Sequence, residues 1–120
     1  MIILDSGLGG ISVVRALRAQ GARVPLTYIA DTAGFPYGSR ASADINARAK
    51  QLVNAAAATA AHGPVVLACN TLSTLCLESL RAVFAMDFVG TVPAIKTAAQ
   101  HSTTRRFTLL ATHNTTYSTY

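Results

Sequence analysis

Apolar runs alternate along the chain with stretches whose hydrophobic residues recur at helical spacing. A short apolar run bounded by glycine or proline is typical of a buried strand, and a longer amphipathic or alanine-rich stretch is typical of a helix. The pattern predicts strands over residues 2–4, 26–30, 65–68, 88–89 and 107–111. It predicts helices over residues 11–20, 41–62, 72–84 and 93–101, a loop over 32–40 and a polar tail over 112–120.

Strands that alternate with helices in this way predict an α/β fold, a doubly wound parallel sheet with helices on both faces. The strands are uniformly apolar rather than alternating, as expected where both faces of a sheet are covered. A chain of 120 residues is the size of one domain. Ligands of such sheets bind at the carboxyl ends of the strands. We therefore look for chemistry in the residues that follow each strand.

Composition narrows the class of protein. Apolar residues make up 51% of the chain and charged residues 12%, which is typical of a packed domain rather than a disordered segment or a coiled coil. No apolar stretch reaches the roughly 18 residues that a membrane span needs. The first apolar residues run directly into Asp5-Ser6-Gly7 with no signal-peptide pattern, so we expect a soluble, cytoplasmic protein without membrane partners.

The net charge of +5 indicates an anionic partner. Only Arg105 and Arg106 are adjacent among the ten basic residues, and the chain has no nucleic-acid-binding motif. We therefore expect a small anionic substrate and no specific nucleic acid. Cys69 and Cys76, seven residues apart on one helix, would lie ~10 Å apart, too far for a disulfide. Two free thiols are typical of a reducing compartment.

Cys69 is the residue with the most distinctive chemical context. It ends an apolar strand and precedes a helix, whose positive end favours a thiolate that can act as a base or a nucleophile. Asn70 and Thr71 follow it with donors suited to a carboxylate. A lone cysteine can also simply fill space in a core. Cys76 lies among leucines within the helix, and we interpret it as a core residue.

Small polar residues follow the other strands as well, so one rim of the sheet should collect them. Asp5 can act as a base, hold an ammonium group, or merely cap the next turn. The glycines after it do not match the G-x-G-x-x-G pattern, and we expect no nucleotide. His101 and His113 have no ligand spacing with cysteine or aspartate, and we expect no metal.

Five segments in register carry a resemblance to a known family. They are Asp5-Ser6-Gly7-Leu8-Gly9-Gly10, Pro36-Tyr37-Gly38, Ala68-Cys69-Asn70-Thr71, Val92-Pro93-Ala94-Ile95-Lys96 and Leu109-Leu110-Ala111-Thr112. In this order and spacing the chain resembles the N-terminal half of glutamate racemases, in the aspartate/glutamate racemase family. The resemblance implies one α/β domain over residues 1–120 of a normally two-domain racemase, truncated at its C-terminus.

The resemblance also implies an activity, the cofactor-independent interconversion of L- and D-glutamate for bacterial peptidoglycan synthesis. Family members use two cysteines, one on each side of the α-carbon. Cys69 corresponds to the first, which deprotonates D-glutamate, and Asp5 to the carboxylate that assists it. The residues that correspond to substrate-binding positions are Ser6, Pro36, Tyr37, Gly38, Asn70, Thr71 and Thr115. Backbone N–H groups around Gly38 and Asn70 would hold the carboxylates.

The chain departs from the family in one important way. The second cysteine of the family lies in a Cys-Thr-His segment, and this sequence has none. One thiol can exchange the α-proton on one face only, so we expect the chain alone to be catalytically incomplete, with a homodimer as one way to complete it. Two alternatives stay open. One is an aspartate racemase or another member of the superfamily, and the other is a non-catalytic dicarboxylate-binding module.

Overall fold

A four-stranded sheet forms the centre of the computed structural model, which describes residues 1–59 and 63–118. Its strands are β1 (Ile2–Asp5), β2 (Thr27–Ala30), β3 (Val65–Leu67) and β4 (Phe88–Gly90), in the order β2-β1-β3-β4. All neighbouring pairs are parallel. The predicted parallel sheet is confirmed for four of the five expected strands.

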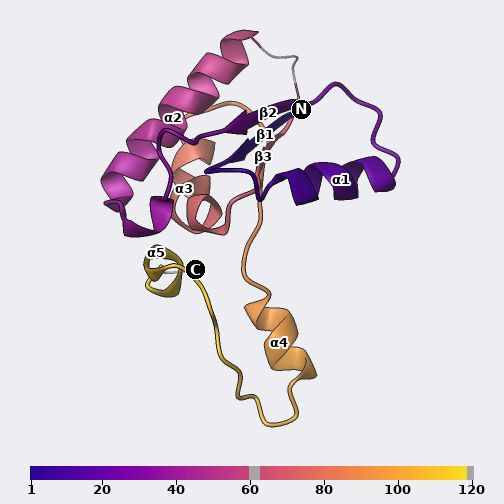
Figure 1. Ribbon diagram of the computed structural model, residues 1–120, viewed down its shortest axis with the longest axis vertical. Helices are drawn as coiled ribbons and strands as arrows, with labels where there is room; N and C mark the ends of the chain where they lie inside the picture. The colour runs from indigo at the N-terminus through magenta and orange to yellow at the C-terminus, as the bar shows by residue number, and fades with distance from the viewer. Residues whose placement is uncertain (60–62, 119–120) are drawn as a thin grey trace.

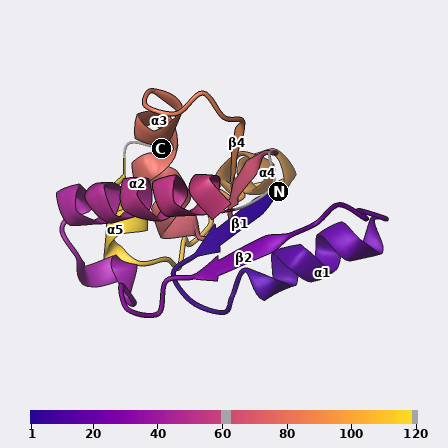
Figure 2. The same cartoon turned by 90° about the horizontal axis from the view of Figure 1, so that it is seen from above.

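Helices cover both faces of this sheet, as predicted. The helical elements of the described chain are α1 (Ile11–Ala19), α2 (Ser42–Thr59), α3 (Asn70–Arg81), α4 (Ile95–His101), α5 (His113–Thr116) and the 3₁₀ turn η1 (Tyr37–Ser39). Figures 1 and 2 show α1 on one face, and α2 and α3 on the other. The end of the predicted 41–62 helix, residues 60–62, lies outside the described residues, as do residues 119–120 of the predicted tail.

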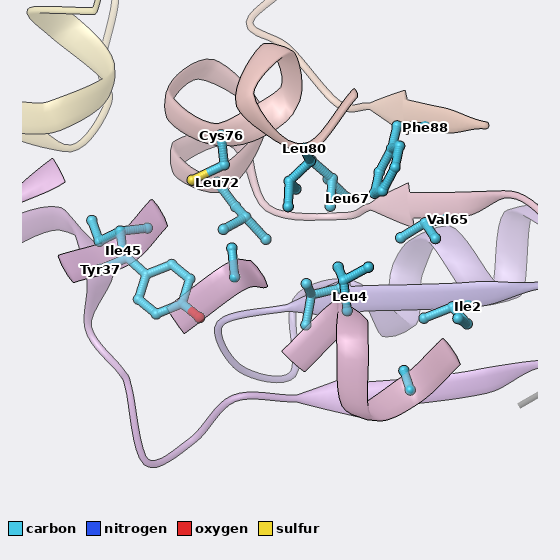
Figure 3. Packing of buried hydrophobic residues seen from close by; sticks show 13 residues of the cluster. Ile2, Leu4, Tyr37, Ile45, Val65, Leu67, Leu72, Cys76, Leu80 and Phe88 are labelled. Atoms are coloured by element: carbon cyan, nitrogen blue, oxygen red, sulfur yellow. The ribbon is translucent and has the colours of Figure 1, made fainter. Parts of the chain in front are cut away.

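The core lies between the sheet and the α2–α3 layer. Successive residues of a strand point to opposite faces, so β1 and β3 each present alternate side chains to these helices. Leu4 and Leu67 are fully buried there and pack with Ile45 of α2 and Leu72 of α3 (Figure 3). The face of the sheet that α1 covers is less tightly packed, because α1 has no buried residue. The central strands β1 and β3 are therefore fixed firmly, and with them the segments that follow them.

The predicted strand over residues 107–111 is wrong. This segment has no strand conformation, and Leu110 is 97% exposed. A strand needs a hydrogen-bonding neighbour, and the apolar pattern encodes only a tendency to be buried. Instead the chain leaves β4, forms α4 at a distance from the sheet, and returns through this segment to α5, which contacts α3 (Figure 1). The polar tail thus contains a short helix that the pattern did not predict.

Candidate active site at the carboxyl edge of the sheet

Cys69 lies where β3 ends and α3 begins, as predicted. It is the N-cap residue of α3 in an extended backbone conformation, and its own carbonyl accepts the Ser73 N–H at 2.9 Å. The thiol is half-buried, and its Sγ lies 3.6 Å from the Ser6 Oγ. Ser6 follows β1, the neighbour of β3 in the sheet. Two residues that are 63 positions apart in sequence therefore meet at the rim.

Asp5, the last residue of β1, is buried and its carboxylate is tightly held. Its Oδ2 accepts the Gly10 N–H at 2.9 Å and the Tyr28 hydroxyl at 3.2 Å. Gly10 has no room for a side chain, since a Cβ there would lie 2.8 Å from the Cβ of Ala68. Burial and the nearby Asp5 carboxylate raise the pKa of Tyr28 to about 12. The Tyr28 hydroxyl therefore remains a proton donor at neutral pH.

A second cluster joins three threonine hydroxyls beside Cys69. Thr71 Oγ1 lies 2.9 Å from Thr112 Oγ1 and 3.3 Å from Thr115 Oγ1. Thr112 caps α5, because its side chain accepts the Thr115 N–H at 3.4 Å. Thr71 and Thr115 are buried. The expected meeting of these residues at the rim occurs, although α5 rather than a fifth strand brings Thr115 there.

The loop after β2 is anchored by an ion pair between buried Asp31 and the partly exposed Arg48. Asp31 accepts hydrogen bonds from the Arg48 guanidinium, the Tyr37 hydroxyl and the Gly34 N–H. Burial alone would raise the pKa of Asp31, but the hydrogen bonds from Arg48 and Tyr37 lower it below its ordinary value. The pKa of Arg48 is raised by the hydrogen bond to Asp31. Asp31, which follows β2 directly, therefore serves as the anchor of this loop.

This anchor determines how the segment from Pro36 to Gly38 faces the rim. The Tyr37 ring is buried in the core, where burial and the Asp31 carboxylate raise its pKa (Figure 3). Gly38 lies against Thr112, since a Cβ at Gly38 would be 2.9 Å from the Thr112 Cβ. Pro36, after a cis peptide bond, is exposed. What Tyr37 can offer a ligand is therefore its backbone rather than its hydroxyl.

The remaining predicted residues have contrasting surroundings. Asn70, the first residue of α3, is exposed at the rim. Cys76 is fully buried in the core, and burial raises the pKa of its thiol to about 12. Both cysteines are free, as expected from their spacing. Cys69 is thus the thiol that can meet a ligand, and Cys76 is a core residue as predicted.

An open pocket of about 320 Å³ adjoins the rim. Gly7, Leu8, Thr32 and Phe35 line it. Leu8 is 68% exposed and Phe35 62%, so an apolar surface lies next to the Ser6–Cys69 contact. Across residues 1–59 and 63–118, no group of three or more histidine, cysteine or acidic residues could hold a metal ion. In the same described ranges no helix is long and apolar enough to cross a membrane.

Two residues that contact the aspartates of the candidate site, Tyr28 and Arg48, escaped the sequence analysis. Tyr28 belongs to no motif. The signal that could have found it is the register of β2 against β1, in which Tyr28 pairs with Ile3, two residues before Asp5 on the same strand. Arg48 looks like one more basic residue on a polar helix face. Nothing in the sequence pattern indicates its pairing with Asp31, 17 residues earlier.

Comparisons with known proteins agree with the motifs. No protein-family model matches the chain. A glutamate racemase of Granulibacter bethesdensis is 42% identical over 112 residues, which cover 93% of this chain and 41% of that protein. The chain thus spans about two-fifths of the length of the curated relatives it matches.

Solved structures give the same result. The glutamate racemase of Escherichia coli, in complex with L-glutamate and the activator UDP-MurNAc-Ala, has a TM-score of 0.78 and 38% identity, covering 86% of this chain and 40% of that one. The enzyme of Aquifex pyrophilus has a TM-score of 0.76 and 32% identity, covering 84% and 40%. This chain is therefore similar in sequence and fold to the glutamate racemases, over about two-fifths of their length.

Proposed function

We propose that this chain carries one catalytic face of a glutamate racemase, with Cys69 as the base that exchanges the α-proton of glutamate. The observation that supports this most is the placement of Cys69. Its thiol is half-buried at the rim, at the N-cap of the 12-residue helix α3 and 3.6 Å from Ser6. The positive end of a helix favours a bound carboxylate.

The chemistry balances with this one thiol and the substrate. The Cys69 thiolate takes the α-proton and becomes a thiol, and the electron pair of the broken C–H bond passes into the α-carboxylate as an enediolate. Return of a proton from Cys69 restores the same enantiomer. Return from a second acid on the opposite side gives the other enantiomer. We assign to Asp5 the role of assisting this thiol and holding the substrate ammonium group.

The surrounding polar groups suit a dicarboxylic amino acid. Side-chain donors at the rim include Asn70, which is exposed, and Ser6 beside the thiol. We assign substrate binding to the residues of this rim: Ser6, Asn70, Thr71, Thr115, and the backbone of Pro36, Tyr37 and Gly38. We also propose a role in supplying D-glutamate for peptidoglycan, in the cytoplasm and without a cofactor, and the similarity to glutamate racemases supports this role.

Full racemisation needs a second acid–base group. Cys76 does not supply it, since its thiol is enclosed in the core and its pKa is raised to about 12. We therefore propose that the second base comes from polypeptide outside this chain or from a second copy of it. Until that base is present, the expected activity is α-proton exchange without inversion.

Hydrogen–deuterium exchange tests this function. Each enantiomer of glutamate is incubated with the protein in D₂O, and loss of the α-proton signal is followed by NMR. Exchange should occur with the unaltered protein, vanish in Cys69→Ala and persist in Cys76→Ala, the matched control for removal of a thiol. Aspartate, run in parallel, distinguishes an aspartate racemase. Glutamate binding that survives in Cys69→Ala, without exchange by any variant, would indicate a binding module instead.

A further inference from the structure

Tyr28 links the Asp5 carboxylate to the loop that follows it. Tyr28 lies on β2, directly beside β1. Its hydroxyl lies 2.9 Å from the Gly7 carbonyl oxygen and 3.2 Å from Asp5 Oδ2, and it donates to both. One O–H proton is thus shared between the backbone of the loop and the carboxylate. No motif of the sequence singles out this tyrosine.

The two hydrogen bonds to Asp5 share one oxygen atom. Gly10 donates its N–H to the same Oδ2 at 2.9 Å, and no described residue donates to Oδ1. The packing around this point is close, because a Cβ on Gly10 would lie 3.0 Å from the Asp5 Cβ and 3.1 Å from the Tyr28 hydroxyl. Oδ2 is therefore committed to the protein, which leaves Oδ1 for a ligand.

We propose that Tyr28 is a positioning residue: by holding Oδ2, its hydroxyl fixes the χ1 rotamer of the Asp5 side chain, so that Oδ1 is presented to the substrate ammonium group. This assignment rests on the function proposed above. Tyr28 itself does not touch substrate. Its hydroxyl stays protonated across the neutral range, since burial and the carboxylate raise its pKa to about 12. The support given to Asp5 is therefore constant at any pH where the protein would work.

Tyr28→Phe removes the hydroxyl and keeps the ring. Tyr117→Phe is the matched control, because Tyr117 is 79% exposed and lies at the end of α5. The first measurement is the χ1 angle of Asp5, from three-bond scalar couplings in a protein labelled at its four aspartates. A single rotamer is expected in the unaltered protein and in Tyr117→Phe. Averaging between rotamers is expected in Tyr28→Phe.

The second measurement is α-proton exchange with glutamate in D₂O. Tyr28→Phe should lower kcat for exchange by about 10-fold while KM changes less than about twofold, because misorientation of a catalytic group affects the reacting geometry more than binding. A structural role alone would lower the melting temperature and leave kcat per folded molecule unchanged. That result would overturn the proposal.

The two measurements separate the proposal from the function on which it rests. If the unaltered protein exchanges no α-proton, the proposed function fails, and the Asp5 couplings still decide whether Tyr28 positions the carboxylate. If Asp5 keeps one rotamer in Tyr28→Phe, the positioning role is refuted, whatever the exchange rate of the unaltered protein. Before either measurement, the NMR spectrum of the backbone amides is used to verify that the Tyr28→Phe variant is folded.

Discussion

Replacing Asp31 with asparagine tests the anchor of the loop between β2 and α2. The substitution preserves the size of the side chain and removes its charge. It also replaces one acceptor oxygen with an NH₂ group, which cannot accept a hydrogen bond from the neighbouring donors. Asp31 accepts from the Arg48 guanidinium, the Tyr37 hydroxyl and, at 3.1 Å, the Gly34 N–H. Because asparagine keeps only one acceptor oxygen, Asp31→Asn can retain only some of these hydrogen bonds.

The size of the effect follows from burial. Asp31 is 3% exposed, and loss of one partner from a buried ion pair costs about 3–5 kcal/mol. The Arg48 side chain is 32% exposed, so water can partly solvate it when its partner is lost. We therefore expect the free energy of unfolding at pH 7 to fall by about 2–3 kcal/mol. Asp87→Asn, at an exposed position, should change it by less than about 0.5 kcal/mol.

Urea denaturation followed by circular dichroism measures both variants. The pH dependence gives a second test. Because the pKa of Asp31 is lowered in the folded protein, its stabilising effect is fully present above the unfolded-state pKa of about 3.9 and is lost as pH falls through the lower folded-state value. The difference between the unaltered protein and Asp31→Asn should therefore shrink below about pH 4.

Two results would refute this reasoning. One is an Asp31→Asn variant as stable as Asp87→Asn at pH 7, which would mean that the cluster contributes no net stability. The other is a stability difference that stays constant from pH 7 to pH 3, because Asp31 becomes protonated in the unfolded chain within this range and a stabilising carboxylate must then lose part of its contribution.

Three further predictions concern packing and thiol chemistry. Gly10→Ala should lower stability by about 1–3 kcal/mol because its Cβ would overlap the neighbouring strand end, whereas Gly9→Ala, whose Cβ would have only an ordinary 3.7 Å contact, should change little in a urea titration. Leu4→Ala should cost about 2–5 kcal/mol at a fully buried site, and Leu110→Ala close to none at a 97% exposed one, both read from the unfolding midpoint. Cys76 should resist iodoacetamide in the native protein and react only in urea, as mass spectrometry will show, since it is buried and its pKa is about 12; rapid native labelling would contradict its place in the core.

The sequence pattern predicted the central sheet well because both faces of β1 and β3 are buried. Such strands appear as uninterrupted apolar runs, and helices between them leave few topologies. Cys69 was found for the same reason, since a strand end followed directly by a helix defines its position. The pattern puts Cys69 shortly before a helix over residues 72–84, and α3 begins earlier, at Asn70, so that Cys69 is its N-cap.

The errors arise where structure depends on a partner far away in sequence. Residues 107–111 have strand-like composition, but no strand of the described chain lies beside them. Tyr28 and Arg48 act through contacts 23 and 17 residues away, with Asp5 and Asp31 respectively. Periodicity reports which face of an element is buried. It does not report which polar group meets which.

The stereochemistry of deuterium incorporation tests the central claim, that Cys69 reaches the α-carbon from one side only. D-glutamate is incubated with the protein in D₂O. The two enantiomers are then separated by chiral chromatography, and the deuterium content of each is measured by mass spectrometry. The account predicts deuterated D-glutamate with no accumulation of L-glutamate, and no deuterium with Cys69→Ala. Deuterated L-glutamate formed by the unaltered protein as a monomer would show a second acid–base group within one copy of this chain and contradict the account.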